Sequence, residues 1–282
     1  MQELKSVMVD FQITSKCHLN CKYCFDILKG TSDKATWELL ESIDKLYDSG
    51  IRAVCVTGGE PAKRDDINEI LQYIHNKGMY LYLSTQGNYI KRLSDKTIMM
   101  LNCIGLPLDT LNEETNYKLG RPHNQKDIFL SAYNRIHMVN PKCLIKIGTV
   151  VNKFNINDLE ELGEFIEKNT SGCTWRLYEF NPIGNGEFYK TLLSITTNEF
   201  ENVVLKLKRI FSNIDIVPMY IKDAENGYFF VGPQMDLLYF AEKEFVKIGD
   251  LSNMSPNDVI QALSLTFSDI GEKIAENRRW LN

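Results

Sequence analysis

Three cysteines lie within one eight-residue segment, C17-H-L-N-C21-K-Y-C24. Thiolates are soft ligands that suit iron–sulfur clusters and zinc. Three thiolates at this spacing can hold three irons of a [4Fe–4S] cube and leave the fourth iron open, whereas an ordinary electron-transfer cluster uses four cysteines. An open iron can be chelated by a substrate or cofactor. The segment therefore predicts one reactive cluster held by Cys17, Cys21 and Cys24.

Two other interpretations of this segment remain open. A structural zinc ion could use the three cysteines together with His18. Because His18 directly follows Cys17, shared tetrahedral ligation by these two residues is awkward, and the sequence contains no second CxxC pair. The cysteines could also be a chance grouping of buried residues. The cluster is favoured, and a non-catalytic zinc or iron–sulfur binding module is the alternative from another class.

A second motif, T57-G-G-E-P61, follows an apolar segment. Gly58 and Gly59 lack side chains, so the backbone can approach a ligand closely and offer N–H donors. Glu60 could accept a hydrogen bond from a cationic amino group, or it could be an ordinary carboxylate at a loop.

Apolar strand patterns alternate with amphipathic helix patterns over the first two-thirds of the chain, which predicts a parallel sheet with helical crossovers. The expected strands are 7–14, 51–57, 79–84, 103–109, 143–151 and 175–180, and the expected helices are 37–48, 65–76, 94–100, 127–139 and 157–168. Six such units favour an α/β fold with an incomplete (βα)6 barrel, and a doubly wound open sheet is the alternative. In both folds the working residues lie at the carboxyl ends of the strands.

The rhythm changes after Asn181, which predicts a barrel core at residues 1–181 and a small α+β C-terminal extension at 182–282 packed on it. A helix is expected at 197–211 and one or two more within 256–280. Short segments at 214–219, 228–231, 237–240 and 245–248 are expected to be small antiparallel strands.

The two motifs together, with Tyr23 before the third cysteine, resemble those of the radical S-adenosylmethionine (SAM) superfamily. The resemblance implies one [4Fe–4S] cluster, SAM, an external one-electron reductant and a 5′-deoxyadenosyl radical that abstracts hydrogen from a substrate. It also implies a set of SAM contacts: Tyr23, Gly58, Gly59, Glu60, Thr85, Asp109 and Arg121. In T85-Q-G87, Gln86 stands where relatives often have asparagine.

Further segments resemble the viperin-like enzymes of this superfamily, which dehydrate nucleoside triphosphates. These are V9-D-F-Q-I-T-S-K-C17, C24-F-D-I-L-K29, K146-I-G-T-V-V-N-K-F-N155 and W175-R-L-Y-E179. The resemblance implies that Lys29, Lys146 and Arg176 bind the triphosphate. Asp10, Gln12 and Gly148 depart from the viperin-like pattern, and a carboxylate at Asp10 would repel phosphate if it faced the pocket.

A peptide or natural-product substrate is the competing interpretation. No catalytic acid or base is selected by the sequence, and the candidate hydrogen-atom donors are Cys173, Tyr178 and Tyr117.

Bulk composition narrows the function classes further. With 44% apolar and 24% charged residues the chain has the composition of a globular protein. A net charge of −5 disfavours nonspecific nucleic-acid binding. We expect no transmembrane segment, because no run of about 18 apolar residues occurs, and no signal peptide. Seven cysteines, an odd number, favour a cytoplasmic protein over a secreted disulfide framework. The scattered Cys55, Cys103, Cys143 and Cys173 are expected to be core residues.

Overall fold

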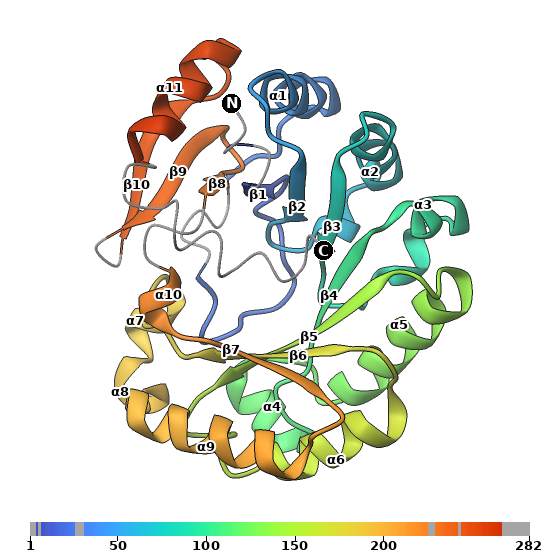
Figure 1. The fold of residues 1–282 in the computed structure, drawn as a ribbon, viewed down its shortest axis with the longest axis vertical. Coiled ribbons are helices and arrows are strands. Elements are labelled where there is room, and N and C mark those ends of the chain that lie inside the picture. Colours follow the sequence, from blue (N-terminus) through green and yellow to red (C-terminus); the bar gives the residue numbers. More distant parts are fainter. Residues whose placement is uncertain (1–3, 5–6, 26–30, 225–228, 242–243, 267–282) are drawn as a thin grey trace.

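The computed structural model describes residue 4 and residues 7–25, 31–224, 229–241 and 244–266. Strands and helices alternate around a curved sheet (Figure 1). The elements of the N-terminal half are β1 (Met8–Gln12), α1 (Thr36–Asp48), β2 (Ala53–Thr57), η2 (Pro61–Lys63), α2 (Ile67–Asn76), β3 (Tyr80–Ser84), η3 (Ile90–Arg92), α3 (Asp95–Met100), β4 (Cys103–Pro107), α4 (Glu113–Leu119) and α5 (Gln125–Val139). The remaining elements are β5 (Leu144–Val151), α6 (Leu159–Asn169), β6 (Thr174–Glu179), α7 (Asn185–Phe188), α8 (Lys190–Leu193), α9 (Thr197–Ile210), β7 (Asp215–Met219), α10 (Ile221–Ala224), β8 (Phe229–Val231), β9 (Asp236–Ala241), β10 (Glu244–Asp250) and α11 (Pro256–Thr266).

One ten-stranded sheet runs in the order β10-β9-β8-β1-β2-β3-β4-β5-β6-β7. The strands from β1 to β6 are parallel neighbours in chain order, as the alternating pattern predicts. β7 and β10 lie at opposite ends of the sheet, which is therefore open rather than closed. The incomplete α/β barrel is confirmed.

The prediction for the strands after residue 181 was partly wrong. β7 pairs with β6 and β8 pairs with β1, both in parallel, so these strands extend the barrel sheet at its two sides. The expected antiparallel pairing occurs between β8 and β9 and between β9 and β10. Edge strands leave backbone N–H and C=O groups that an incoming strand of either direction can pair with. The expected final helix is α11, and residues 267–282 lie outside the described residues.

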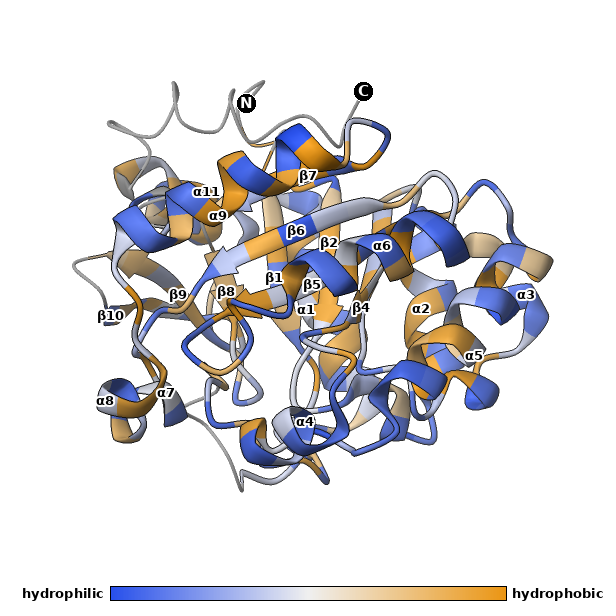
Figure 2. Ribbon diagram, turned by 90° about the horizontal axis from the view of Figure 1, so that it is seen from below, coloured by the Kyte–Doolittle hydropathy of each residue, from blue (hydrophilic) through white to orange (hydrophobic). Residues whose placement is uncertain are grey.

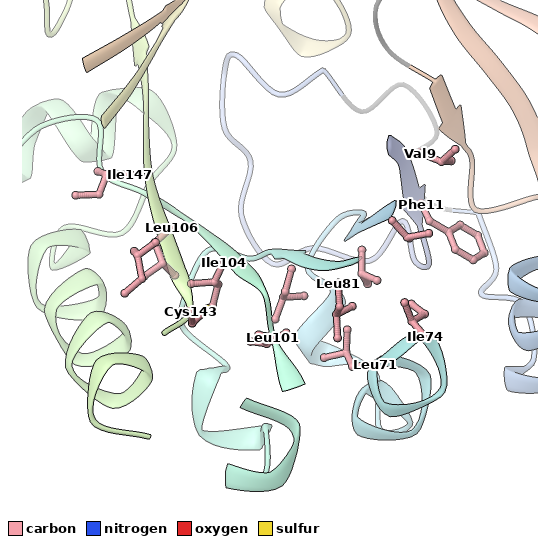
Figure 3. Packing of buried hydrophobic residues seen from close by; sticks show 14 of the residues in the cluster. Val9, Phe11, Leu71, Ile74, Leu81, Leu101, Ile104, Leu106, Cys143 and Ile147 are labelled. Carbon is pink, nitrogen blue, oxygen red and sulfur yellow. The ribbon is translucent and has the colours of Figure 1, made fainter. Parts of the chain in front are cut away.

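Side chains of each barrel strand alternate between a helix-facing core and the barrel interior. In β1, Val9 and Phe11 are fully buried in the core, whereas Asp10 lines an internal cavity. Figure 3 shows the helix-facing side, where Leu71 of α2 lies beside Leu81 of β3. In Figure 2 hydrophobic colour gathers on the strands, and the outer surfaces of the helices are largely hydrophilic. Because of this alternation, the strands can place polar side chains such as Asp10 in the barrel interior while their apolar side chains pack against the helices.

Among the described residues, no helix combines the length and the apolar character needed to cross a bilayer.

Candidate cofactor and substrate site

A cavity of about 500 Å³ occupies the barrel interior, a size that suits a small organic ligand. The three cysteines of the first motif line it together with two cations of the fifth and sixth strands, Lys146 and Arg176. The sequence-predicted residues that line it are Cys17, Cys21, Tyr23, Cys24, Gly58, Gly59, Thr85, Asp109, Arg121, Lys146 and Arg176. Lys29 lies outside the described residues.

The cysteine trio has a donor set that fits an iron–sulfur cluster. Burial raises the pKa of the Cys21 thiol to about 11; nearby Arg121 opposes this, and Cys24 and Cys17 add to it. All three cysteines line the same cavity. No three His, Cys, Asp or Glu side chains of the described chain are grouped as a single metal ion requires. A [4Fe–4S] cube is larger, and each cysteine attaches to a different iron.

His18 contacts the loop after β3 rather than the cavity. Its Nε2 lies 3.0 Å from Asn88 Nδ2, and its ring packs edge-on against Tyr89. These contacts disfavour the zinc interpretation, which needs His18 as the fourth ligand.

The loop after β2, which contains the second motif (residues 57–61), forms hydrogen bonds with the loop that carries the cysteines. The N–H of Gly59 donates to the carbonyl of Thr14 (2.8 Å), and the N–H of Glu60 donates to that of Lys16 (2.9 Å). Gly58 has φ +146°, and a Cβ there would lie 2.3 Å from the Thr14 oxygen. We expected the N–H groups of Gly58 and Gly59 to serve a ligand; that of Gly59 is used to hold the cysteine loop instead, and both glycines line the cavity.

Glu60 is buried, 1% exposed, and is not among the residues that line the cavity. Its Oε1 accepts hydrogen bonds from the Ala62 N–H (3.0 Å) and the Thr85 hydroxyl (2.6 Å), and its Oε2 accepts one from the Gln86 N–H (2.8 Å). Burial raises its pKa, against these hydrogen bonds. The expected contact of this carboxylate with a cofactor amino group stays a prediction. Glu60 positions the β3 loop.

Two other glycines, Gly120 and Gly184, let the cysteine loop approach its neighbours; a Cβ at Gly184 would lie 2.7 Å from the Cys24 oxygen. Gly120 ends α4 at φ +79°, and a Cβ there would lie 2.2 Å from the Asn20 oxygen. Asn185, after β6, donates its backbone N–H to the Cys24 carbonyl (2.8 Å) and its side-chain amide to the Cys21 carbonyl (3.1 Å). Loops from three parts of the chain thus fix one short segment.

Tyr23, Asp109 and Arg121 form a single hydrogen-bonded group on the cavity wall. The Tyr23 hydroxyl donates to Asp109 Oδ2, and Arg121 Nε donates to the Tyr23 hydroxyl (2.6 Å) and to Asp109 Oδ2 (3.1 Å). The Val150 N–H holds Asp109 Oδ1 (2.8 Å). Burial raises the pKa of Tyr23, so its hydroxyl remains a donor at neutral pH. The sequence predicted these three residues as cofactor contacts; the structure brings them together.

The floor of the cavity carries charges of both signs. Strand register places Asp10 opposite Cys55, and Cys55 opposite Tyr82. Burial raises the pKa of Asp10 to about 6, opposed by a hydrogen bond with Cys55 and by the charges of Arg176 and Lys146. Lys146 is 5% exposed, with Nζ 4.7 Å from the Tyr82 ring centroid, and burial lowers its pKa. Asp10 therefore faces the pocket, and its carboxylate would repel a phosphate bound there.

Of the candidate hydrogen-atom donors, Tyr178 lines the cavity. Tyr117 is 67% exposed on α4, and Cys173 is buried outside the residues that line the cavity.

An aromatic part of the cavity wall was not predicted. It consists of Phe25, Phe230, Phe240 and Phe245, whose rings pack on one another at centroid distances from 4.9 to 6.3 Å. Strands β8 to β10 supply three of these rings. They reach the cavity because β8 pairs with β1, a contact between distant segments that no local sequence pattern signals.

Comparison with known proteins establishes the class of this chain. The family model described as the Radical SAM superfamily matches residues 11–166, more than half of the chain. The chain belongs to the radical SAM superfamily. It is an enzyme family that uses SAM and an iron–sulfur cluster.

Sequence relatives include nucleotide-directed enzymes. An S-adenosylmethionine-dependent nucleotide dehydratase of Selenomonas ruminantium is 26% identical over 255 residues, which are 86% of this chain and 89% of that protein. A GTP 3′,8-cyclase of Clostridium perfringens is 27% identical over 218 residues, 71% of this chain and 62% of the cyclase.

Solved structures share the fold at low sequence identity. Streptococcus suis SuiB bound to precursor peptide SuiA superposes with a TM-score of 0.73 at 14% identity, covering 97% of this chain and 66% of SuiB. The enzyme anSMEcpe with bound AdoMet and a peptide gives 0.65 at 14% identity, covering 93% and 84%. These likenesses support the fold.

Proposed function

We propose that this chain is a radical SAM enzyme with a single [4Fe–4S] cluster held by Cys17, Cys21 and Cys24, and that it dehydrates a nucleoside triphosphate. Once bound, the cluster and SAM would supply a 5′-deoxyadenosyl radical for hydrogen abstraction, with electrons from an external reductant in a reducing, cytoplasmic compartment. The observation that carries the substrate proposal is the presence of Lys146 and Arg176 in the same cavity as the three cysteines. The nucleotide dehydratase relatives point in the same direction.

The residues of the chain have distinct tasks in this proposal. Tyr23, Asp109 and Arg121 form a pre-organised wall, and a guanidinium held at its Nε can direct its other N–H groups toward a carboxylate such as that of SAM. Thr85 and the two glycines of the second motif complete the side of the cavity next to the cysteine loop.

Lys146 and Arg176 are suited to a polyanion. Burial lowers the pKa of Lys146, so its charged form is costly in the empty cavity. A bound phosphate would stabilise that charge, since charge-assisted hydrogen bonds are stronger than neutral ones. Asp10 offsets part of this attraction, so the net charge of the pocket floor is smaller than two cations alone would give.

The test is an anaerobic reaction of reduced, reconstituted enzyme with SAM and each common nucleoside triphosphate in turn. The expected result is 5′-deoxyadenosine together with a nucleotide that has lost one water, detected by mass spectrometry. Formation of 5′-deoxyadenosine with no altered nucleotide would refute the nucleotide proposal and favour a peptide or natural-product substrate.

Two variants separate substrate binding from cofactor binding. Lys146→Met combined with Arg176→Met should weaken triphosphate binding by about a hundredfold or more, because each of the two lost charge-assisted hydrogen bonds is worth about 1.5–3 kcal/mol. Iron content and SAM binding should persist. Lys142→Met, on an exposed lysine just before β5, is the matched control and should leave triphosphate affinity unchanged.

A further inference from the structure

A side-chain amide lies beside one of the three cysteine sulfurs. Gln86 follows β3, is 7% exposed and lines the cavity. Its Nε2 lies 3.8 Å from Cys17 Sγ, within the range of an N–H···S hydrogen bond. The backbone N–H of Leu19 approaches the same sulfur at 3.4 Å. Cys17 therefore has two N–H donors around its sulfur, one of them from a distant loop.

The position of Gln86 is fixed by groups that do not touch the sulfur. Its backbone N–H donates to Glu60 Oε2 at 2.8 Å, and the Thr85 hydroxyl donates to Glu60 Oε1 at 2.6 Å. Its Oε1 accepts a hydrogen bond from Asn88 Nδ2 at 3.5 Å. With the carbonyl directed at Asn88, the two N–H bonds of the amide are left for Cys17 Sγ and for His18 Nδ1, which lies 3.5 Å from Nε2.

We propose that Gln86 donates a hydrogen bond to the Cys17 sulfur and thereby raises the reduction potential of the cluster. This rests on the proposed ligation of the cluster by Cys17, Cys21 and Cys24. Reduction adds one negative charge to a cluster, part of which resides on the sulfurs. An N–H donor stabilises that added charge, and hydrogen bonds to cluster sulfurs are a known determinant of potential. Gln86 is thus a tuning residue that makes the one-electron reduction easier.

Buried Glu60 helps to hold the Gln86 amide in place. A carboxylate that accepts hydrogen bonds from its own loop and from the β3 loop holds the two loops together. It fixes the backbone from which the Gln86 amide extends. The second motif, which grips the cysteine loop, would therefore also set the distance between the amide and the sulfur.

The experiment measures the midpoint potential of the reconstituted cluster by a redox titration followed by electron paramagnetic resonance, without SAM or substrate. Gln86→Leu should lower the equilibrium constant for reduction about tenfold, which corresponds to a negative shift of 59 mV for a one-electron couple. Gln72→Leu is the matched control, since Gln72 lies on α2 and donates to Thr97 Oγ1 at 3.0 Å. The control should keep the wild-type potential.

A decrease of more than twofold in the reduction equilibrium, confined to Gln86→Leu, supports the proposal. A smaller change, or an increase, with full iron content overturns it. If Gln86→Leu does not retain iron, Gln86→Glu serves instead: it has the same size, cannot donate when ionised, and should lower the potential further. Wild-type protein that binds no iron refutes the cluster ligation itself, an outcome distinct from an unchanged potential.

Discussion

Replacing Asp10 with asparagine should stabilise the fold in a way that depends on pH. Asp10 is buried on the cavity floor, and its pKa is raised from 3.8 to about 6. A folded-state pKa above the unfolded value means that ionisation disfavours the folded state. The cost is absent below about pH 4, where both states are protonated, and is complete above about pH 6. At about 1.4 kcal/mol per pKa unit, a shift of about two units costs about 3 kcal/mol at pH 7.

The neutral side chain of the D10N protein carries no such cost. Its advantage in free energy of unfolding should be between about 1 and 2 kcal/mol at pH 5 and should reach about 3 kcal/mol at pH 7 to 8. The assay is urea unfolding of metal-free wild-type and variant protein across that pH range, followed by far-UV circular dichroism. Asp48→Asn, at an exposed position of α1, is the control. A difference between D10N and wild type that does not grow with pH would refute the burial of the Asp10 charge.

The same substitution tests whether bound phosphate lies near the cavity floor. Two unit charges roughly 6 Å apart interact by about 1–3 kcal/mol for effective dielectric constants between about 80 and 20. Removing the Asp10 charge should therefore tighten inorganic triphosphate binding between severalfold and about a hundredfold at pH 7.5. The gain should shrink below pH 6, where wild-type Asp10 is itself protonated. Calorimetric titration of wild-type and D10N protein with inorganic triphosphate measures this difference. If the two proteins bind triphosphate equally well both at pH 7.5 and below pH 6, the phosphate does not lie near Asp10.

Three further substitutions test the loops and the core. Gly59→Ala should lose most of its bound iron after reconstitution, because a Cβ there would lie 2.5 Å from the Lys16 oxygen and would displace the cysteine loop. Cys21→Ala should abolish the broad visible absorption of the cluster, measured with iron content. Trp175→Phe should lower the free energy of unfolding by about 1–3 kcal/mol in urea titration, because it removes the buried hydrogen bond from Trp175 Nε1 to Thr149 Oγ1, 2.9 Å.

Two controls make these results specific. Gly78→Ala has open space around the new Cβ and carries only the strain of φ +74°, so it should keep its iron. Cys55→Ala removes a thiol that lines the cavity outside the motif, and it should also keep the cluster. Gly78→Ala is compared with Gly59→Ala, and Cys55→Ala with Cys21→Ala. If a control loses as much iron as the variant it is compared with, general destabilisation explains the loss and not a change in the cysteine loop.

The barrel core could be predicted well because each of its strands and helices shows its own pattern within a short segment of the sequence. Period-two alternation in β1, β2 and β3 separates helix-facing residues from interior ones. The structure places Asp10, Cys55 and Tyr82 on the interior side, although Cys55 was expected to be a core residue. Parallel register then places them in one row. The site after β1 could be predicted for the same reason, because the three cysteines expected to bind one cluster lie within eight residues of the sequence.

Contacts between distant segments could not be predicted in this way. Nothing within residues 229–231 indicates that β8 pairs in parallel with β1, because the partner lies more than two hundred residues away. The aromatic wall follows from that pairing. The task of Glu60 was missed because its three hydrogen-bond donors come from two loops, and a loop carboxylate looks the same in the sequence whether it faces a ligand or its own backbone.

Rigidity of the cysteine loop follows from backbone contacts more than from side chains. The carbonyls of Thr14, Lys16, Cys21 and Cys24 all accept hydrogen bonds from loops that follow β2 or β6. Each close approach needs a glycine, because a Cβ at Gly58, Gly59 or Gly184 would lie within 2.7 Å of the cysteine-loop backbone. The loop is thus held largely through its carbonyls, and all three of its cysteines line the cavity. The glycines are therefore as necessary to this three-cysteine site as the cysteines. They allow the close backbone contacts that fix the loop whose cysteines line the cavity.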